Sequence, residues 1–253
     1  MDLRTEYLKQ QDWRSWHKYI SHIPLSESDC VLDLGCSVGG VSKLLSEKVR
    51  QVVGIDVNPE FIEYCNSIKT QNETFYCTDF LNIDFCSLPS FTGVWASFSL
   101  SYLENPQSFL QTLNSHIEKG GWIALLDVSS FISGNMDLQS TYYEKIKGFE
   151  KCISPFRGYD FEFGIKMESI LESAGFKVVH KDDDVEDQEF NFNGRANNEI
   201  IEAWNVRLDR MPMLQLFLGD DFEPFKSEFL EYLMSEQHER RESLRFLVAK
   251  KTN

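Results

Sequence analysis

Apolar residues from Cys30 onward alternate between short continuous runs and helical spacing. Runs of this kind are typical of buried parallel strands, and the spacing of three or four between them is typical of one helix face. The predicted strands are CVLDLGC, QVVGIDV, ETFYCTDF, TGVWASFSL, WIALLDVS, KVVH and SLRFLVAKK. Strand–helix alternation implies right-handed crossovers, so the pattern predicts an α/β fold with a doubly wound, mostly parallel seven-stranded sheet.

Local signals indicate where the predicted helices begin and end. Pro59 suits a first helical turn, where its missing N–H costs nothing, and Asn58 before it suits the cap. A later helix is predicted to include Ile117, and Gly120 and Gly121 are predicted to end it.

No linker-like stretch or internal repeat interrupts the pattern, so we expect one domain over residues 1–253. The expected parts are N-terminal lid helices at 1–29, a cofactor-binding core at 30–130, helical substrate-lid insertions at 131–165 and 190–240, and the last strand at 241–253.

The formal net charge of −15 limits the expected partners. Nucleic acids and anionic membranes attract basic surfaces. The balance therefore favours a small-molecule substrate and argues against nucleic acid and membrane as partners, while the oligomeric state stays open.

Six cysteines without a CxxC pair favour reduced thiols over disulfides or metal. The N-terminus has no apolar signal segment, and no apolar run approaches the roughly 20 residues of a membrane span. We therefore expect a cytoplasmic protein without a metal. The acidic run at 181–189 is predicted to be a solvated strand end and loop, because such dense like charges need water.

The turn after the first strand carries the most specific chemistry. Gly35 and Gly39 allow a sharp turn and close approach of a ligand. A pyrophosphate cradle usually reads G-x-G-x-x-G, but Ser37 stands where the second glycine would be. The carboxylate of Asp33 would repel pyrophosphate and would suit a ligand with an ammonium and a sulfonium, as in S-adenosylmethionine (SAM).

Acidic residues close the next two strands. Asp56 is predicted to accept ribose hydroxyls, because Asn58 fills the alternative role of helix cap better, and Val57 would pack on the adenine. Asp79 is predicted either to accept a hydrogen bond from the adenine amino group or to be a plain turn residue. Phe80 would offer its backbone N–H to the ring.

These motifs together resemble class I SAM-dependent methyltransferases, which have a Rossmann-like sheet. The matching stretches are VLDLGCSVGG, VVGIDVNPEFI, CTDFLNIDF, WASFSLSYLENPQSFLQTL and KGGWIALLDVS. The resemblance implies that the loop 35–40, with Cys36, wraps the methionine part of SAM. It also implies that Asp56 holds the ribose, that Asp79 and Phe80 hold the adenine, and that Ser97 lies near the methionine amine.

A narrower resemblance covers the C-terminal part. The stretch from Asn198 to Leu233 and the final SLRFLVAKK look like the lid and last strand of trans-aconitate methyltransferase-like small-molecule methyltransferases. Residues 99–103 depart from the substrate motif of that group, so only the layout is carried over.

Methyl transfer from a sulfonium is an in-line displacement that mainly needs alignment and exclusion of water. A carboxylate acceptor needs a cationic anchor, and Arg157 is the preferred candidate over Arg195, Arg207 and Arg210. A hydroxyl or amine acceptor would benefit from a base. The weak candidates on the substrate side are therefore Arg157, His17 and Tyr102.

The aromatic segment from Tyr7 to Tyr19 is predicted either to cap the cofactor pocket, with Arg14 near the SAM carboxylate, or to pack on the sheet as an amphipathic helix. The function expected from the sequence is methylation of a small molecule, with O-methylation of a carboxylate or hydroxyl slightly preferred. The alternatives are a SAM-binding regulatory or interaction protein without turnover, and a protein or RNA methyltransferase.

Overall fold

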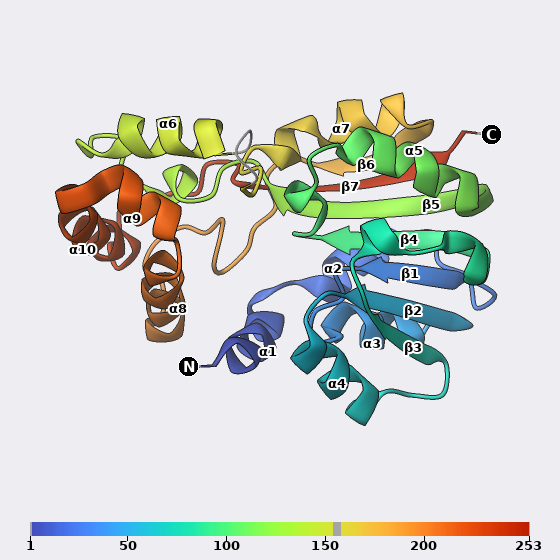
Figure 1. The fold of residues 1–253 in the computed structure, drawn as a ribbon. Helices are drawn as coiled ribbons and strands as arrows, with labels where there is room; N and C mark the ends of the chain where they lie inside the picture. Colours follow the sequence, from blue (N-terminus) through green and yellow to red (C-terminus); the bar gives the residue numbers. More distant parts are fainter. Residues whose placement is uncertain (1, 154–157, 253) are drawn as a thin grey trace. The chain divides into compact units, whose positions relative to one another are not determined.

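The computed structural model describes residues 2–153 and 158–252. Seven strands form one sheet in the order β3-β2-β1-β4-β5-β7-β6, seen from bottom to top in Figure 1. The strands are β1 (Cys30–Leu34), β2 (Gln51–Asp56), β3 (Glu73–Cys77), β4 (Phe91–Ser97), β5 (Ile117–Val128), β6 (Phe176–Asp182) and β7 (Leu244–Lys251). β1 to β5 pair in parallel, whereas β6 and β7 are antiparallel. The predicted doubly wound, mostly parallel α/β sheet is confirmed.

Helices follow most strands, as the crossovers require. They are α1 (Leu3–Trp13), α2 (Trp16–Ser21), α3 (Gly40–Ser46), α4 (Pro59–Ile68), α5 (Pro106–His116), α6 (Tyr143–Ile153), α7 (Phe163–Ser173), α8 (Asn198–Asp209), α9 (Pro212–Leu218) and α10 (Phe222–Leu233). Short 3₁₀ helices are η1 (Phe80–Asn82), η2 (Phe85–Ser87), η3 (Leu100–Tyr102), η4 (Ser133–Asn135) and η6 (Gly219–Asp221).

The start of α4 follows the predicted capping. The Asn58 side chain accepts hydrogen bonds from the N–H groups of Glu60 and Phe61, at 2.9 and 3.4 Å. Pro59 occupies the first turn. Asn58 is therefore the cap, which leaves the carboxylate of Asp56 available for another role.

The predicted boundary between α5 and β5 is wrong. The helix ends at His116, and Ile117 already belongs to β5, where it pairs with Phe91 of β4. A register shift between Phe91 and Gly93 lets the strand continue through the two glycines. Apolar spacing misplaced Ile117 because a buried residue at a helix end and one at a strand start look alike.

The chain folds into two compact units, which we describe separately. The first comprises residues 1–127, 166–182 and 246–253 and contains nearly all of the sheet. The second comprises residues 128–165 and 183–245, and it contains α6 and α8 to α10. The insertions expected at 131–165 and 190–240 lie in the second unit, and their role as substrate lids stays a prediction.

An aromatic core and a buried ion pair hold the second unit together. Trp204 is fully buried, and its ring lies 5.0 Å from Phe131 and 5.1 Å from Phe229. Arg207 packs on the Trp204 ring, and its Nη2 lies 2.6 Å from Oε1 of the buried Glu189. Arg207, one of the sequence candidates for an acceptor anchor, is thus paired with a carboxylate of its own chain.

The acidic run is not solvated throughout, contrary to the prediction. Asp187 and Glu189 are both buried. Asp187 Oδ1 accepts hydrogen bonds from the N–H groups of Glu189 and Phe190, at 2.9 and 2.8 Å. Backbone donors and Arg207 replace the water that these carboxylates would otherwise need.

Among the described residues, no helix is both long enough and apolar enough to span a membrane.

Candidate functional site

The glycine loop lies where β1 meets β2 at their carboxyl ends. Gly35 has a φ of +73°, and its N–H and that of Cys36 donate to the carbonyl of Ile55 on β2, at 2.8 and 2.9 Å. Gly39 has a φ of +76° directly before α3. The loop therefore turns as predicted at both glycines and is tied to the neighbouring strand.

Asp56 links the loop to the end of β2. Its Oδ2 accepts a hydrogen bond of 2.8 Å from the Ser37 N–H, and its Oδ1 accepts one of 2.9 Å from the Asn58 N–H. Each carboxylate oxygen can accept a second hydrogen bond. The half-buried carboxylate is thus held rigidly beside the loop with capacity for a ligand hydroxyl.

Ser37 carries a left-handed backbone, with a φ of +51°. This region favours glycine, and most other residues enter it at a cost of about 1–2 kcal/mol. The hydrogen bond from its N–H to Asp56 fixes that conformation. The departure from the glycine pattern at this position is accommodated in the backbone, without loss of the turn.

Asp33 lies beneath the loop rather than at its rim. Its side chain is buried, and Oδ2 accepts a hydrogen bond of 2.5 Å from the Ser42 hydroxyl on α3. Burial raises the pKa of Asp33 to about 7, partly offset by the hydrogen bond from Ser42. The structure therefore places this carboxylate between β1 and α3, where the nearby charge of Asp56 contributes to its raised pKa.

This burial makes a testable prediction about stability. The pKa of Asp33 is higher in the folded state than in the unfolded state. The contribution of Asp33 to the free energy of unfolding is therefore fully present below the ordinary aspartate pKa and is lost as the pH rises through about 7. Asp33→Asn removes this loss, which is at most about 4 kcal/mol at pH 8. We expect urea unfolding to show a larger advantage of Asp33→Asn over the unmutated protein at pH 8 than at pH 5. An equal difference at the two pH values would contradict the prediction.

Cys36 turns its side chain away from the loop surface. The thiol is buried in a cluster with Ile62, Cys65 and Phe75. Burial raises the pKa of Cys36 well above its usual range. Only the backbone of Cys36 therefore fits the predicted contact with a cofactor.

The end of β3 lies next to Asp56, which pairs in register with Cys77. Asp79 caps the short helix η1, because its Oδ1 accepts a hydrogen bond of 2.9 Å from the Leu81 N–H. The Phe80 ring is buried against Phe109 of α5, with centroids 5.3 Å apart. Val57 is 62% exposed, as a residue facing a ligand would be. The adenine contacts of these residues stay predictions.

The end of β4 forms the other side of the loop. Ser99 Oγ donates a hydrogen bond of 2.9 Å to the carbonyl of Leu34. Phe98 has a φ of +53°, which is unusual for so bulky a residue, and its N–H donates to Leu126 of β5 at 2.9 Å. The Arg14 guanidinium lies 5.1 Å from the centre of the Phe98 ring. The structure therefore places the guanidinium of Arg14 near the ring of Phe98, the residue that follows Ser97 in the chain. Spacing alone did not single out Phe98 as strained.

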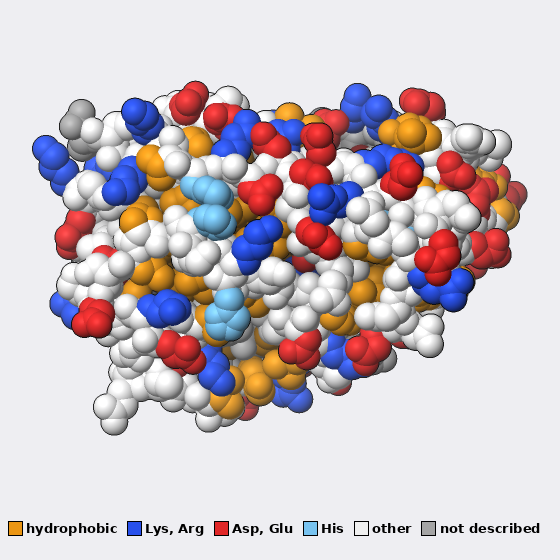
Figure 2. Space-filling view, turned by 180° about the vertical axis from the view of Figure 1, so that it is seen from behind, with side chains coloured by type: hydrophobic (Ala, Val, Ile, Leu, Met, Phe, Trp, Pro, Cys, Tyr) orange, Lys and Arg blue, Asp and Glu red, His pale blue; other side chains and the backbone are white. Residues whose placement is uncertain are grey.

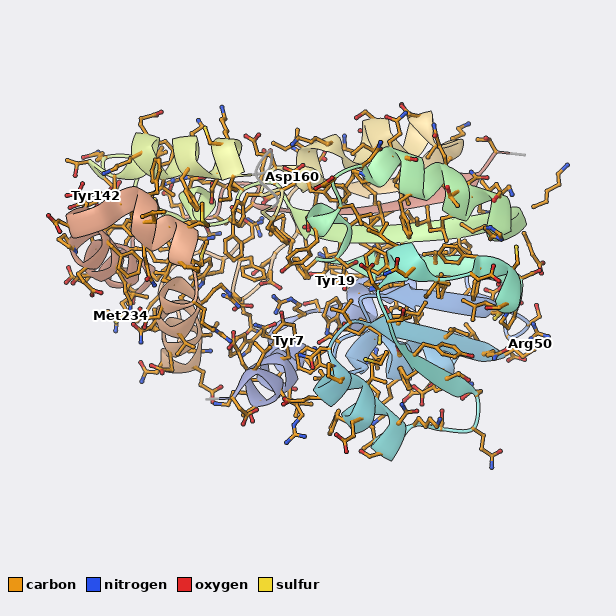
Figure 3. All side chains as sticks on the ribbon, in the orientation of Figure 1. Tyr7, Tyr19, Arg50, Tyr142, Asp160 and Met234 are labelled. Atoms are coloured by element: carbon orange, nitrogen blue, oxygen red, sulfur yellow. The ribbon has the colours of Figure 1, made fainter. Side chains whose placement is uncertain are left out.

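The N-terminal helix lies against the elements around the loop. The ring of Tyr7 on α1, labelled in Figure 3, is 5.0 Å from Phe61 of α4. A Cβ at Gly40 would overlap the side chain of Gln11. These contacts place α1 against the first turns of α4 and α3.

The three substrate-side candidates differ in their surroundings. His17 lies on the exposed face of α2. Tyr102 is 65% exposed on η3. Arg157 lies outside the described residues. Their catalytic roles stay predictions.

The donor set fits the nucleoside and amino-acid parts of SAM. Gly35 is packed so closely that a Cβ there would lie 2.6 Å from the Cβ of Ser99, so the loop needs a glycine at this position. The loop presents one carboxylate, Asp56, to ribose hydroxyls. Arg14 brings a positive charge to the end of β4, where the amino-acid carboxylate of SAM is expected.

Comparisons with known proteins agree with this geometry. The chain matches the methyltransferase domain family over residues 5–181. It is 27% identical to the Bacillus subtilis methyltransferase-named protein YqeM over 61% of this chain and 64% of that protein. It is 28% identical to tRNA U34 carboxymethyltransferase of Shewanella halifaxensis over 49% of this chain and 38% of that enzyme. The match thus spans less than two thirds of these relatives.

Solved structures share the fold at low identity. A Haloferax volcanii methyltransferase in complex with the activator Trm112 has a TM-score of 0.63 at 16% identity, covering 99% of this chain and 93% of that chain. A methyltransferase of Bacillus halodurans has a TM-score of 0.62 at 17% identity, covering 94% and 99%. The narrower resemblance to trans-aconitate methyltransferase is not confirmed by these comparisons.

The predicted partners need correction. A small-molecule substrate without nucleic acid is contradicted, because curated relatives are named for tRNA and a solved neighbour is bound to the protein Trm112. The prediction relied on the net charge of −15, which is a sum over the whole chain. Recognition depends on the local potential at the contact surface, which such a sum does not describe.

Proposed function

The chain belongs to the methyltransferase domain family and is a SAM-dependent methyltransferase, and we propose what it methylates. The proposed methyl acceptor is a nucleoside of RNA. The observation that carries the cofactor half of the proposal is the carboxylate of Asp56, held beside the glycine loop by the N–H groups of Ser37 and Asn58. The acceptor half is supported by the relatives named as tRNA enzymes.

Asp56 would bind the ribose hydroxyls, with Val57 against the adenine and Asp79 and the Phe80 N–H at its edge. The loop from Gly35 to Gly39 would surround the methionine part. These positions follow the carboxyl ends of β1, β2 and β3, where ligands bind in open parallel sheets.

The bound cofactor supplies an electrophilic methyl group on a sulfonium. The contribution of the protein is to hold the two reactants in line and to exclude water. Asp56 and the loop fix the nucleoside half of the cofactor. The clamped end of β4, with hydrogen bonds from Phe98 to β5 and from Ser99 to β1, would keep the reacting edge rigid.

An RNA acceptor has to be reconciled with an acidic protein. On the face shown in Figure 2, Lys and Arg side chains are interspersed with Asp and Glu, without a continuous basic surface. A surface without a continuous basic area would make only weak contacts with RNA phosphates. We therefore expect a low affinity for RNA, which falls further as the salt concentration rises. Recognition would then depend on the nucleoside in the site or on a second protein. The Haloferax methyltransferase is itself in complex with the methyltransferase activator Trm112.

The proposal is tested by incubating the protein with SAM carrying a labelled methyl group and with total tRNA, and separately with a metabolite extract. We expect label in nucleosides after nuclease digestion, as a mass gain of one methyl. Asp56→Ala should lose this label, which shows that the site described here is responsible. Label confined to the metabolite extract would overturn the RNA acceptor.

A further inference from the structure

The end of strand β4 contains a side-chain hydrogen bond that has no part in the cofactor contacts proposed above. The indole N–H of Trp95 donates to the hydroxyl oxygen of Ser97 at 3.2 Å. Residues two apart on a strand project from the same face of the sheet. Ser97 is the final residue of β4, so this hydrogen bond links the buried strand to its carboxyl edge.

The indole is held in place by the packing around it. Trp95 is fully buried, with Trp16 of α2 at 6.1 Å edge-on and Phe246 of β7 at 5.9 Å between ring centroids. Tyr19, labelled in Figure 3, closes this cluster at 6.0 Å from Trp16 and 5.3 Å from Phe246. A buried indole N–H only donates, so it keeps the Ser97 oxygen as its acceptor.

This arrangement fixes where the hydroxyl hydrogen can go. A serine hydroxyl has one hydrogen to donate and two lone pairs. Trp95 occupies one lone pair, and in the part of the chain that the structure describes the Ser97 side chain has no other hydrogen-bond partner. The half-buried hydroxyl therefore presents a donor at the sheet edge.

The neighbourhood of that donor suits an anion. Phe98 follows Ser97 directly, and the guanidinium of Arg14 lies 5.1 Å from the Phe98 ring. Ser97 is expected near the amine of the amino-acid end, and the carboxylate of that end is bonded to the same carbon atom. A hydroxyl donor on Ser97 and the cation of Arg14 near the next residue would suit this carboxylate, since hydrogen bonds to an ionised group are the stronger kind.

We propose that Trp95 is a positioning residue, which turns the Ser97 hydroxyl hydrogen toward the carboxylate of SAM. The proposal rests on the proposed function and on the carboxylate position expected at the end of β4, and it goes beyond both because it assigns a role to a residue that does not touch the cofactor.

The test uses calorimetry with two ligands. S-adenosylhomocysteine carries the amino-acid end, and 5′-methylthioadenosine has the same nucleoside without it. We expect Ser97→Ala to weaken S-adenosylhomocysteine binding about tenfold and Trp95→Phe about threefold, with 5′-methylthioadenosine unchanged in both. The double variant should bind like Ser97→Ala alone, because Trp95 acts through Ser97.

A matched control is available in β5. Trp122 is also buried, and its indole N–H has no hydrogen-bond partner within the described residues. Trp122→Phe should therefore leave the affinity for S-adenosylhomocysteine unchanged at a comparable loss of thermal stability.

The outcomes separate the two proposals. Three results would overturn the role of Trp95. They are an equal loss of affinity for both ligands, additive losses of affinity in the double variant, and an unchanged affinity of Ser97→Ala for S-adenosylhomocysteine. A wrong cofactor placement would give a different result, because Asp56→Ala would then leave the affinity for S-adenosylhomocysteine unchanged.

Discussion

Replacing Asp56 by alanine is expected to weaken SAM binding by about 10- to 100-fold. The carboxylate is fixed by the N–H groups of Ser37 and Asn58, so it meets the ribose hydroxyls without first being ordered. Its removal takes away charge-assisted hydrogen bonds in a half-buried position and frees the loop at Ser37. Titration calorimetry with SAM measures the effect directly.

A second acidic residue provides the control for this prediction. Asp84 also accepts a backbone hydrogen bond, from the Cys86 N–H at 3.0 Å, and caps the short helix η2. Asp84→Ala thus removes a carboxylate that accepts a backbone hydrogen bond away from the end of β2, and it should leave SAM affinity unchanged. A folded Asp56→Ala protein with unaltered SAM affinity would rule out the site described here.

Gly35→Ala is expected to remove most cofactor binding and to lower the free energy of unfolding by about 3–5 kcal/mol. Two costs combine at this position. The φ of +73° is unfavourable for alanine, and the new Cβ would lie 2.6 Å from the Cβ of Ser99. Ser99 cannot easily move, because its hydroxyl is bonded to the Leu34 carbonyl.

The two costs can be separated with another glycine. Gly120 has nearly the same φ, +77°, but a Cβ there meets no atom within 4 Å. Gly120→Ala should therefore cost only the backbone term, about 1–2 kcal/mol. Urea unfolding of both variants gives the comparison, and equal losses would show that the contact with Ser99 does not matter. Adding Ser99→Gly to Gly35→Ala should restore part of the stability.

Charge was the least reliable guide to the acceptor. The basic residues after α10 are engaged with the acidic run, since Arg240 pairs with Asp184 at 3.2 Å and Arg245 with Asp183 at 3.4 Å. These pairs show that acidic and basic side chains lie side by side, so the net charge of −15 says little about any one surface. This is why the comparisons, rather than the composition, bear on the acceptor.

Local signals determined the strands, the glycine turn and the cap at Asn58. These features depend on residues close in sequence: short apolar runs for strands, glycine for positive φ, and an amide oxygen for the free N–H groups of a helix start. The position of Asp56 followed from the same logic, because an acidic residue at the end of a parallel strand lies at the edge where ligands bind.

The tertiary structure alone decided which carboxylate faces the edge and which is buried. Asp33 and Asp56 look alike in sequence, yet Asp33 lies under α3 with Ser42, whereas Asp56 spans the loop. The tertiary structure also placed Arg14 on Phe98 and Trp95 behind Ser97. The contacts of Asp33, Asp56 and Arg14 join residues distant in the chain, and the Trp95–Ser97 contact depends on packing from α2 and β7. The direction of each side chain follows from neighbours that only the folded sheet brings together.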